Sequence, residues 1–222
     1  MSRDGEPGLT GMILHPVAAA AAVRAERGRL ADFVEGLDEA QWSTSSLCEA
    51  WTVRHVVAHL STTTHVRLPE LLANALRARG SFDRMEIQVA DRLVTRHTDA
   101  ELVARLRESA ASDRRMPLSK PMDPLMDVVI HAQDIVRPLD LPYASPPAVV
   151  AASLDHVAGD KLMGGPKRLA GVRITSTDTG WSTGEGLEVS GRDTDLLLAV
   201  AGRPAGLDAL SGPGLERLAS QL

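Results

Sequence analysis

The stretch Asp127-Val-Val-Ile-His131-Ala-Gln-Asp134 places three ionisable side chains inside an apolar segment that extends from Leu125 to Val136. With 3.6 residues per turn, Asp127, His131 and Asp134 fall on one stripe of a helix, at i, i+4 and i+7. The other positions are apolar nearly all the way round, which is typical of a buried helix. An uncompensated buried carboxylate costs several kcal/mol. These side chains therefore either pair with one another and with basic groups, or hold a metal ion.

The composition narrows the class of protein. The chain has 222 residues, 44% of them hydrophobic, and its net charge of -5 argues against nucleic acid or an anionic membrane as a partner. No run of uninterrupted apolar residues is long enough for a membrane span. The N-terminus lacks the apolar core of a signal peptide, and the single cysteine, Cys48, excludes an internal disulfide. We therefore expect a cytoplasmic protein, either a monomer or a homodimer.

Hydrophobic periodicity and turn residues divide the chain into a flexible leader (1–12), a helical bundle (13–142) and a small α+β domain (143–222). We expect helices over residues 16–35, 52–77 with a kink at Pro69, 83–95, 98–110, 123–136, 145–163, 193–200 and 213–222. Pro138 and Pro142 are expected to close the helix over 123–136. Alternation predicts strands over 172–177 and 186–190.

A carboxylate and an imidazole one helical turn apart can bind the same ion, which makes Asp127 and His131 candidate metal ligands. A third ligand must come from another helix, and His59, within a strongly apolar helix, is the best candidate. Two histidines and one carboxylate leave a coordination position open, as a catalytic site requires. Spacing alone still favours the alternative, a buried hydrogen-bonded pair of the acid and His131. If the site holds a metal ion, we expect Asp134 to orient a histidine that binds it.

Two further residues, His55 and Cys48, are weaker candidates for a functional role at this site. His55 shares a face with His59 and is a possible fourth ligand, although its place in the first turn favours exposure to solvent. Cys48 is a possible nucleophile, but no neighbour in the sequence would favour its thiolate. We interpret Cys48 as a packing residue.

The segment Trp42-x5-Cys48-x2-Trp51-Thr-Val-Arg-His-Val-Val-Ala-His59-Leu is similar to the signature of the mycothiol-dependent maleylpyruvate isomerase family. That family belongs to the wider DinB-like group of metal-binding four-helix bundles. The second half of its signature is an acid, three residues, a histidine and then an Asp three further on, which matches the stretch 127–134. Residues 172–222 resemble, more loosely, the small sterol-carrier-protein-like domain that follows the bundle in these enzymes.

The resemblance implies a divalent metal, usually zinc, held by His59, Asp127 and His131. It also implies mycothiol, a low-molecular-weight thiol, as a cosubstrate that the metal converts to a thiolate. Family members use this for isomerisation through a transient thiol adduct, or for S-transfer to a small electrophile. An arginine of the C-terminal domain assists the isomerase by holding a substrate carboxylate. Here Arg203 is the better match and Arg192 the alternative.

The chain departs from the family pattern at two positions. Asp127 stands where Glu is common, so the shorter side chain must approach the ion more closely or bind through one oxygen. His55 stands where Asp is common, which removes a helix-capping acid and adds a possible ligand.

The sequence thus predicts a metal-dependent thiol transferase or isomerase. The competing hypothesis is a non-catalytic DinB-like protein whose site binds a metal or small ligand for a structural or regulatory purpose. The sequence leaves open the electrophile, the choice among zinc, nickel and iron, and whether Asp127 ligates directly.

Overall fold

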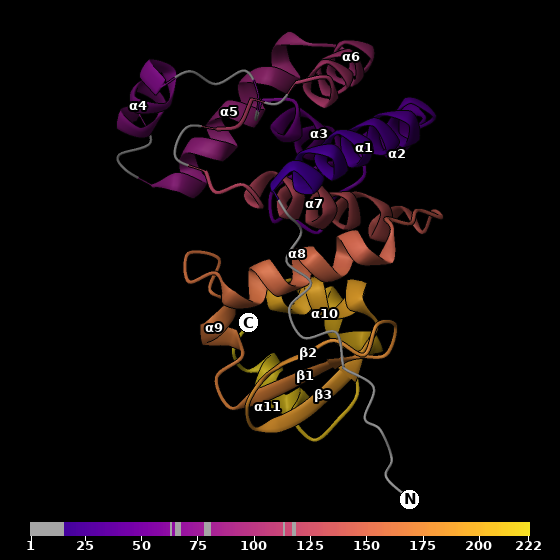
Figure 1. Ribbon diagram of the computed structural model, residues 1–222. Coiled ribbons are helices and arrows are strands. Elements are labelled where there is room, and N and C mark those ends of the chain that lie inside the picture. The colour runs from indigo at the N-terminus through magenta and orange to yellow at the C-terminus, as the bar shows by residue number, and fades with distance from the viewer. Residues whose placement is uncertain (1–15, 63, 65–67, 78–80, 113, 117–118) are drawn as a thin grey trace, which may run out of the picture. The chain divides into compact units, whose positions relative to one another are not determined.

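A computed structural model describes residues 16–222, apart from 63, 65–67, 78–80, 113 and 117–118. The predicted leader, residues 1–12, lies outside the described residues. The described chain forms two compact units, residues 16–144 and 145–222 (Figure 1).

The first unit is helical, and four of its helices form the bundle. Helix α1 packs against α6 and α7, and α3 packs against the same two helices, while α5 lies against α3. Their shared core consists of fully buried aliphatic side chains, including Leu30, Leu60, Leu102, Leu106, Leu125 and Ile135. The described helices are α1 (Pro16–Glu35), α2 (Glu39–Trp42), α3 (Val53–Leu60), α4 (Leu68–Arg77), α5 (Phe82–Arg96), α6 (Asp99–Ala110) and α7 (Asp123–Leu139).

Helix α7 contains the stretch on which the sequence analysis centred, and it is a buried helix as predicted. Every residue from Pro124 to Val136 is buried except Asp127 and His131, which are partly exposed. Asp134, on the same stripe, is fully buried. The polar stripe is therefore partly exposed at Asp127 and His131 and buried at Asp134.

The prediction of one kinked helix over 52–77 is wrong, because α3 and α4 are separate helices. At the end of α3 the backbone N–H of Thr62 donates to the His59 carbonyl, three residues earlier, and two hydroxyl groups bond to carbonyls of the last turn. Ser61 Oγ donates to the Ala58 carbonyl and Thr62 Oγ1 to the His59 carbonyl, each at 2.7 Å. These side chains occupy carbonyls that a further turn of helix would need.

Helix α7 also differs from its prediction, since it continues past Pro138 and ends at Leu139. Proline has no N–H, so the carbonyl of Asp134, four residues earlier, receives no hydrogen bond from it. The backbone N–H of Leu47 donates to this carbonyl instead, at 3.0 Å. The loop before α3 is thereby tied to α7.

The second unit combines helices with a three-stranded sheet of order β2-β1-β3. Strand β1 pairs antiparallel with β2 and parallel with β3, with Ile174 opposite Thr183 and Val189. Helix α10 packs against α8 and a 3-10 helix, burying Leu196, Leu197 and Leu198. The elements are α8 (Pro147–Gly159), α9 (Gly165–Arg168), β1 (Val172–Ser176), β2 (Ser182–Gly184), β3 (Leu187–Gly191), α10 (Asp193–Val200), the 3-10 helix (Pro204–Ala209) and α11 (Leu215–Ala219).

Strand β2 was not predicted, because Ser-Thr-Gly lacks the alternation of apolar residues that marks a strand. It is defined by its pairing with β1. Trp181, just before it, is buried and donates from Nε1 to Asp155 Oδ1 of α8 at 3.3 Å. The sheet is thus joined to α8 by a side-chain contact that is distant in sequence.

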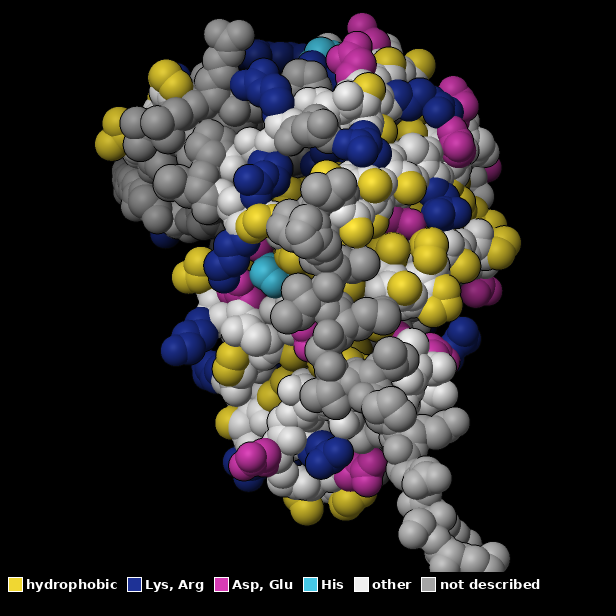
Figure 2. All heavy atoms as spheres, viewed as in Figure 1, with side chains coloured by type: hydrophobic (Ala, Val, Ile, Leu, Met, Phe, Trp, Pro, Cys, Tyr) yellow, Lys and Arg dark blue, Asp and Glu magenta, His cyan; other side chains and the backbone are white. Residues whose placement is uncertain are grey.

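None of the described helices is both long and apolar enough to span a membrane. Basic and acidic side chains lie among hydrophobic ones on the face shown in Figure 2. This mixture agrees with the interspersed charges of the sequence.

Candidate metal centre

Three helices bring the ionisable side chains of the candidate site together. Helix α3 carries His59, α5 carries Glu86, and α7 carries Asp127, His131 and Asp134. Because α3 packs against both α5 and α7, His59 lies between Glu86 and Asp127. The structure therefore assembles the three residues that the sequence predicted as metal ligands.

One carboxylate oxygen of Asp127 faces a ring nitrogen of each histidine. Asp127 Oδ1 lies 3.4 Å from His59 Nε2 and 3.5 Å from His131 Nε2, and the two imidazole centres are 4.8 Å apart. Ligand atoms about 2.1 Å from a tetrahedral ion lie about 3.4 Å from one another. The donor set therefore fits one metal ion, and Asp127 meets both histidines through a single oxygen.

The outer nitrogen of each histidine contacts another carboxylate. His59 Nδ1 is 2.7 Å from Glu86 Oε2, and His131 Nδ1 is 2.8 Å from Asp134 Oδ2. A carboxylate on the outer nitrogen is the usual arrangement around metal-binding histidines, because it fixes the ring and the position of its proton. The predicted orienting contact of Asp134 is present. Glu86, which no sequence motif marks and whose partner lies on another helix, was missed.

These contacts favour one placement of the ring protons. The contacts of Nδ1 with Glu86 and Asp134 are shorter than those of Nε2 with Asp127, so a neutral imidazole at His59 or His131 would keep its proton on Nδ1 and present an Nε2 lone pair toward Asp127. Two lone pairs and a carboxylate oxygen then converge with no proton among them. Such an arrangement attracts a cation, which is either a metal ion or an additional proton.

The pKa values of His59 and Asp127 follow from the charges that surround them. Burial alone would lower the pKa of His59, but the charge of Asp127 and the contacts with Asp127 and Glu86 outweigh it and raise the pKa to about 10. Burial would raise the pKa of Asp127, but His59, His131 and Arg27 outweigh it and lower the pKa to about 2. Without a metal ion, a proton on His59 therefore neutralises part of the cluster.

Trp51 forms an aromatic wall beside both histidines. Its ring centre lies 5.3 Å from that of His59 and 6.3 Å from that of His131, and its side chain is buried. A large apolar ring at this place keeps water away and strengthens the electrostatic interactions of the imidazoles.

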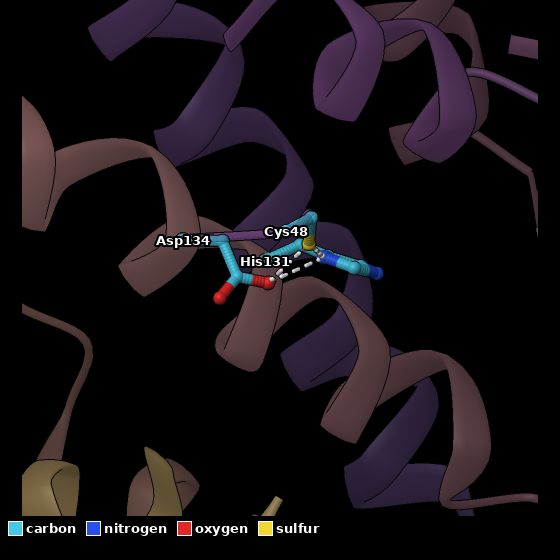
Figure 3. Close-up of side chains that lie close together, drawn as sticks. All are labelled: Cys48, His131 and Asp134. Carbon is cyan, nitrogen blue, oxygen red and sulfur yellow. Dashed lines mark hydrogen bonds and ion pairs between the residues drawn. The ribbon is translucent and has the colours of Figure 1, made fainter. Parts of the chain in front are cut away.

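Cys48 lies in contact with the site, although the sequence analysis interpreted it as a packing residue. Its Sγ is 3.1 Å from Asp134 Oδ2 and 3.7 Å from His131 Nδ1 (Figure 3). Both partners are more than eighty residues away in sequence, so the neighbours of Cys48 in the chain gave no sign of them.

His55 is outside the donor group of His59, Asp127 and His131. Its Nδ1 lies 2.8 Å from Thr52 Oγ1 and completes a capping box at the start of α3. His55 thus takes over the capping function of the acid that is common in the family, and its contacts do not favour a role as fourth ligand.

Arg203 and Arg192, the candidates for a substrate-binding arginine, both belong to the second unit. Arg203 Nη1 donates to the Ala201 carbonyl at 2.9 Å. Its positive charge also acts on Arg168, whose pKa is lowered by the burial of Arg168 itself and by the charge of Arg203. Arg192 is largely exposed, with Nε 3.6 Å from Asp178 Oδ1. The role of either arginine stays a prediction.

In protein stripped of metal by a chelator, we expect the His59 imidazole to titrate near pH 10 rather than at its ordinary pKa of 6.5. Since the folded pKa is the higher one, the stabilisation from His59 is complete below pH 6.5 and is lost as the pH rises through about 10. For Asp127 the sign is opposite: its contribution is present above pH 3.8 and is lost as the pH falls toward 2. NMR titration of the ring, assigned with His59→Gln, checks this, and a midpoint near 6.5 would contradict it.

Comparisons with known proteins bear on the same residues. Residues 23–124 match the family described as Mycothiol maleylpyruvate isomerase N-terminal domain. The match includes His59 and Glu86 and ends before Asp127. No curated protein sequence matches the chain significantly.

Among solved structures, the chain is similar to the crystal structure of the mycothiol-dependent maleylpyruvate isomerase, with a TM-score of 0.56 and 16% sequence identity over 90% of this chain and 93% of that one. A histidine-to-alanine mutant of that isomerase gives a TM-score of 0.57 at the same identity and coverage. This likeness confirms the predicted fold, a helical bundle followed by a small α+β domain. The resemblance seen in the sequence is also confirmed, since residues 23–124 match the model of that family's N-terminal domain.

Proposed function

We propose that the chain is a metal-dependent enzyme that uses mycothiol for isomerisation of, or S-transfer to, a small electrophile. In this proposal His59, Asp127 and His131 hold a divalent metal ion, with zinc as the first choice. The observation that carries it is the convergence of two imidazole nitrogens and one carboxylate oxygen at the spacing of ligands to one ion. The family match of residues 23–124 supports the thiol.

The donor set suits a catalytic ion better than a purely structural one. Structural zinc sites have four protein ligands, whereas three leave a position for an exogenous ligand. Two nitrogens and one oxygen also suit nickel or iron, so the ion is proposed by class. When bound, such an ion lowers the pKa of a coordinated thiol, so that a thiolate forms near neutral pH.

The side chains around the donors would tune this site. Two neutral imidazoles and one carboxylate leave a divalent ion with a net charge of about +1, which favours an anionic thiolate over a neutral thiol. Glu86 and Asp134 lie 2.7 and 2.8 Å from the outer ring nitrogens, where their negative charges would favour protons on Nδ1 and lone pairs directed toward Asp127. Trp51 limits the access of water, which would otherwise compete with the thiol.

The competing proposal, a non-catalytic DinB-like protein that binds a metal or ligand, has one observation in its favour. A proton on His59 satisfies Asp127 and Glu86 at once, so the polar cluster can be stable without an ion. The two proposals differ in one property, which is whether metal binding and a thiol-dependent reaction are lost together.

Purified protein is expected to contain about one divalent ion per chain and to consume mycothiol with an electrophile such as maleylpyruvate or an aryl halide. His59→Ala should lose both ion and activity, by more than the roughly 10- to 100-fold that changes around metal ligands typically cause. Elemental analysis and a thiol-consumption assay measure the two properties, with His97→Ala as the control. Bound metal without thiol chemistry supports the non-catalytic alternative, and metal-free protein unchanged by chelator contradicts both.

Glu86→Gln is expected to weaken zinc binding about 10- to 100-fold, because the neutral amide no longer holds the Nδ1–H of His59 with a full negative charge. Chelator competition measures the affinity. The matched control is Glu185→Gln, at an exposed position of the second unit. Equal affinities for the two variants would show that Glu86 does not act on the site.

Arg203 is proposed to bind a substrate carboxylate, with Arg192 as the alternative. Arg203→Ala should then raise KM for a carboxylate-bearing electrophile at least about tenfold, the loss of a charge-assisted hydrogen bond, and leave an uncharged electrophile unaffected. Steady-state kinetics on both substrates test this. If Arg192→Ala shows the selective effect instead, the role passes to Arg192.

A further inference from the structure

We propose that Cys48 is a positioning residue of the metal centre, whose thiol donates a hydrogen bond to Asp134 and so fixes the ring of His131. This inference rests on the proposed function, in which His131 is a metal ligand. It assigns Cys48 neither the role of a nucleophile nor that of a ligand.

The three side chains form a hydrogen-bonded chain that converges on one oxygen atom. Asp134 Oδ2 accepts from Cys48 Sγ–H at 3.1 Å and faces the Nδ1–H of His131 at 2.8 Å (Figure 3). Asp134 is fully buried, so its carboxylate depends on donors from the protein. A second donor keeps the carboxylate in the rotamer that His131 requires.

The same distances argue against a nucleophilic Cys48. A catalytic thiol needs a base that accepts its proton, but Nδ1 of His131 already directs its proton toward the nearer Asp134 oxygen, while Sγ lies 3.7 Å away. A thiolate 3.1 Å from a buried carboxylate would also suffer like-charge repulsion.

The distances argue equally against a metal ion held by Cys48, His131 and Asp134. His131 Nδ1 and Asp134 Oδ2 are 2.8 Å apart, a hydrogen-bond distance, whereas two ligands of one tetrahedral ion lie about 3.4 Å apart. The donor pairs around Asp127 have the larger spacing, 3.4 and 3.5 Å. The metal therefore belongs on the Nε2 side of His131, and Cys48 acts on the other side of the ring.

The backbone supports the same contact. Pro138 leaves the Asp134 carbonyl without its helical donor, and Leu47 N–H fills the place at 3.0 Å. Two consecutive residues thus bond to Asp134: the N–H of Leu47 donates to its main-chain carbonyl, and the thiol of Cys48 donates to its side-chain carboxylate. Ser46 stabilises this loop, since its Oγ accepts from Cys48 N at 3.1 Å and donates to the Trp51 carbonyl at 2.9 Å.

Comparison of Cys48→Ser with Cys48→Ala tests the donor directly. Serine keeps an O–H donor, whereas alanine removes it, so we expect Cys48→Ala to weaken Zn²⁺ and Co²⁺ binding about tenfold and Cys48→Ser to stay near wild type. A packing role predicts the reverse order, because alanine suits an apolar contact better than serine. Chelator competition gives the affinities, and circular dichroism of the metal-free proteins checks that each variant is folded.

A spectroscopic measurement on the unaltered protein does not depend on whether the variants fold. Because Cys48 is the single cysteine of the chain, the S–H stretching band in a Raman spectrum reports on this thiol alone. The band should lie below that of a free thiol and should return toward it in Asp134→Asn. A band at the free-thiol position in the wild-type protein would overturn the proposal.

The outcomes separate this inference from the proposed function. If wild-type protein binds neither Zn²⁺ nor Co²⁺, the proposed function fails. If it binds them and Cys48→Ala binds them equally well, only the role of Cys48 is overturned. A thiolate-to-cobalt charge-transfer band without added thiol, absent in Cys48→Ser, would make Cys48 a ligand and would also overturn the inference.

Discussion

The structure of the helical unit depends on one electrostatic constraint, the meeting of two imidazoles at a single oxygen of Asp127. This arrangement places a carboxylate and two histidines among apolar helices, where unpaired polar groups are costly. Each member is therefore held from a second direction: His59 by Glu86, and His131 by Asp134. Helices α3, α5 and α7 must all be in place for the cluster to be satisfied.

Much of this arrangement could be predicted because it is encoded locally. The periodicity of residues 123–136 indicated a buried helix, the Thr98 capping box marked the start of α6, and the spacing of Asp127, His131 and Asp134 put them on one stripe. These signals depend on neighbours within one or two turns of helix. For the same reason the expected function of Asp134 agrees with its contact.

The features that sequence reasoning missed depend on contacts between distant segments. Glu86 and Cys48 have ordinary neighbours in the chain, and only the packing of α5 and the loop before α3 brings them to the histidines. The end of α3 was misjudged for a different reason. The chain turns at Ser61 and Thr62, whose hydroxyl groups bond to carbonyls of the last turn, whereas the apolar periodicity suggested a longer helix.

The separation of the donors along the chain has a consequence for folding. His59 and Asp127 are 68 positions apart, so an unfolded chain holds no assembled site. An ion bound to both would act as a cross-link between α3 and α7, and mass action would shift the folding equilibrium toward the native state. At a free metal concentration of 100 times Kd this shift is about 2.7 kcal/mol. The midpoint of thermal unfolding would then rise with the free concentration of such an ion in the surroundings.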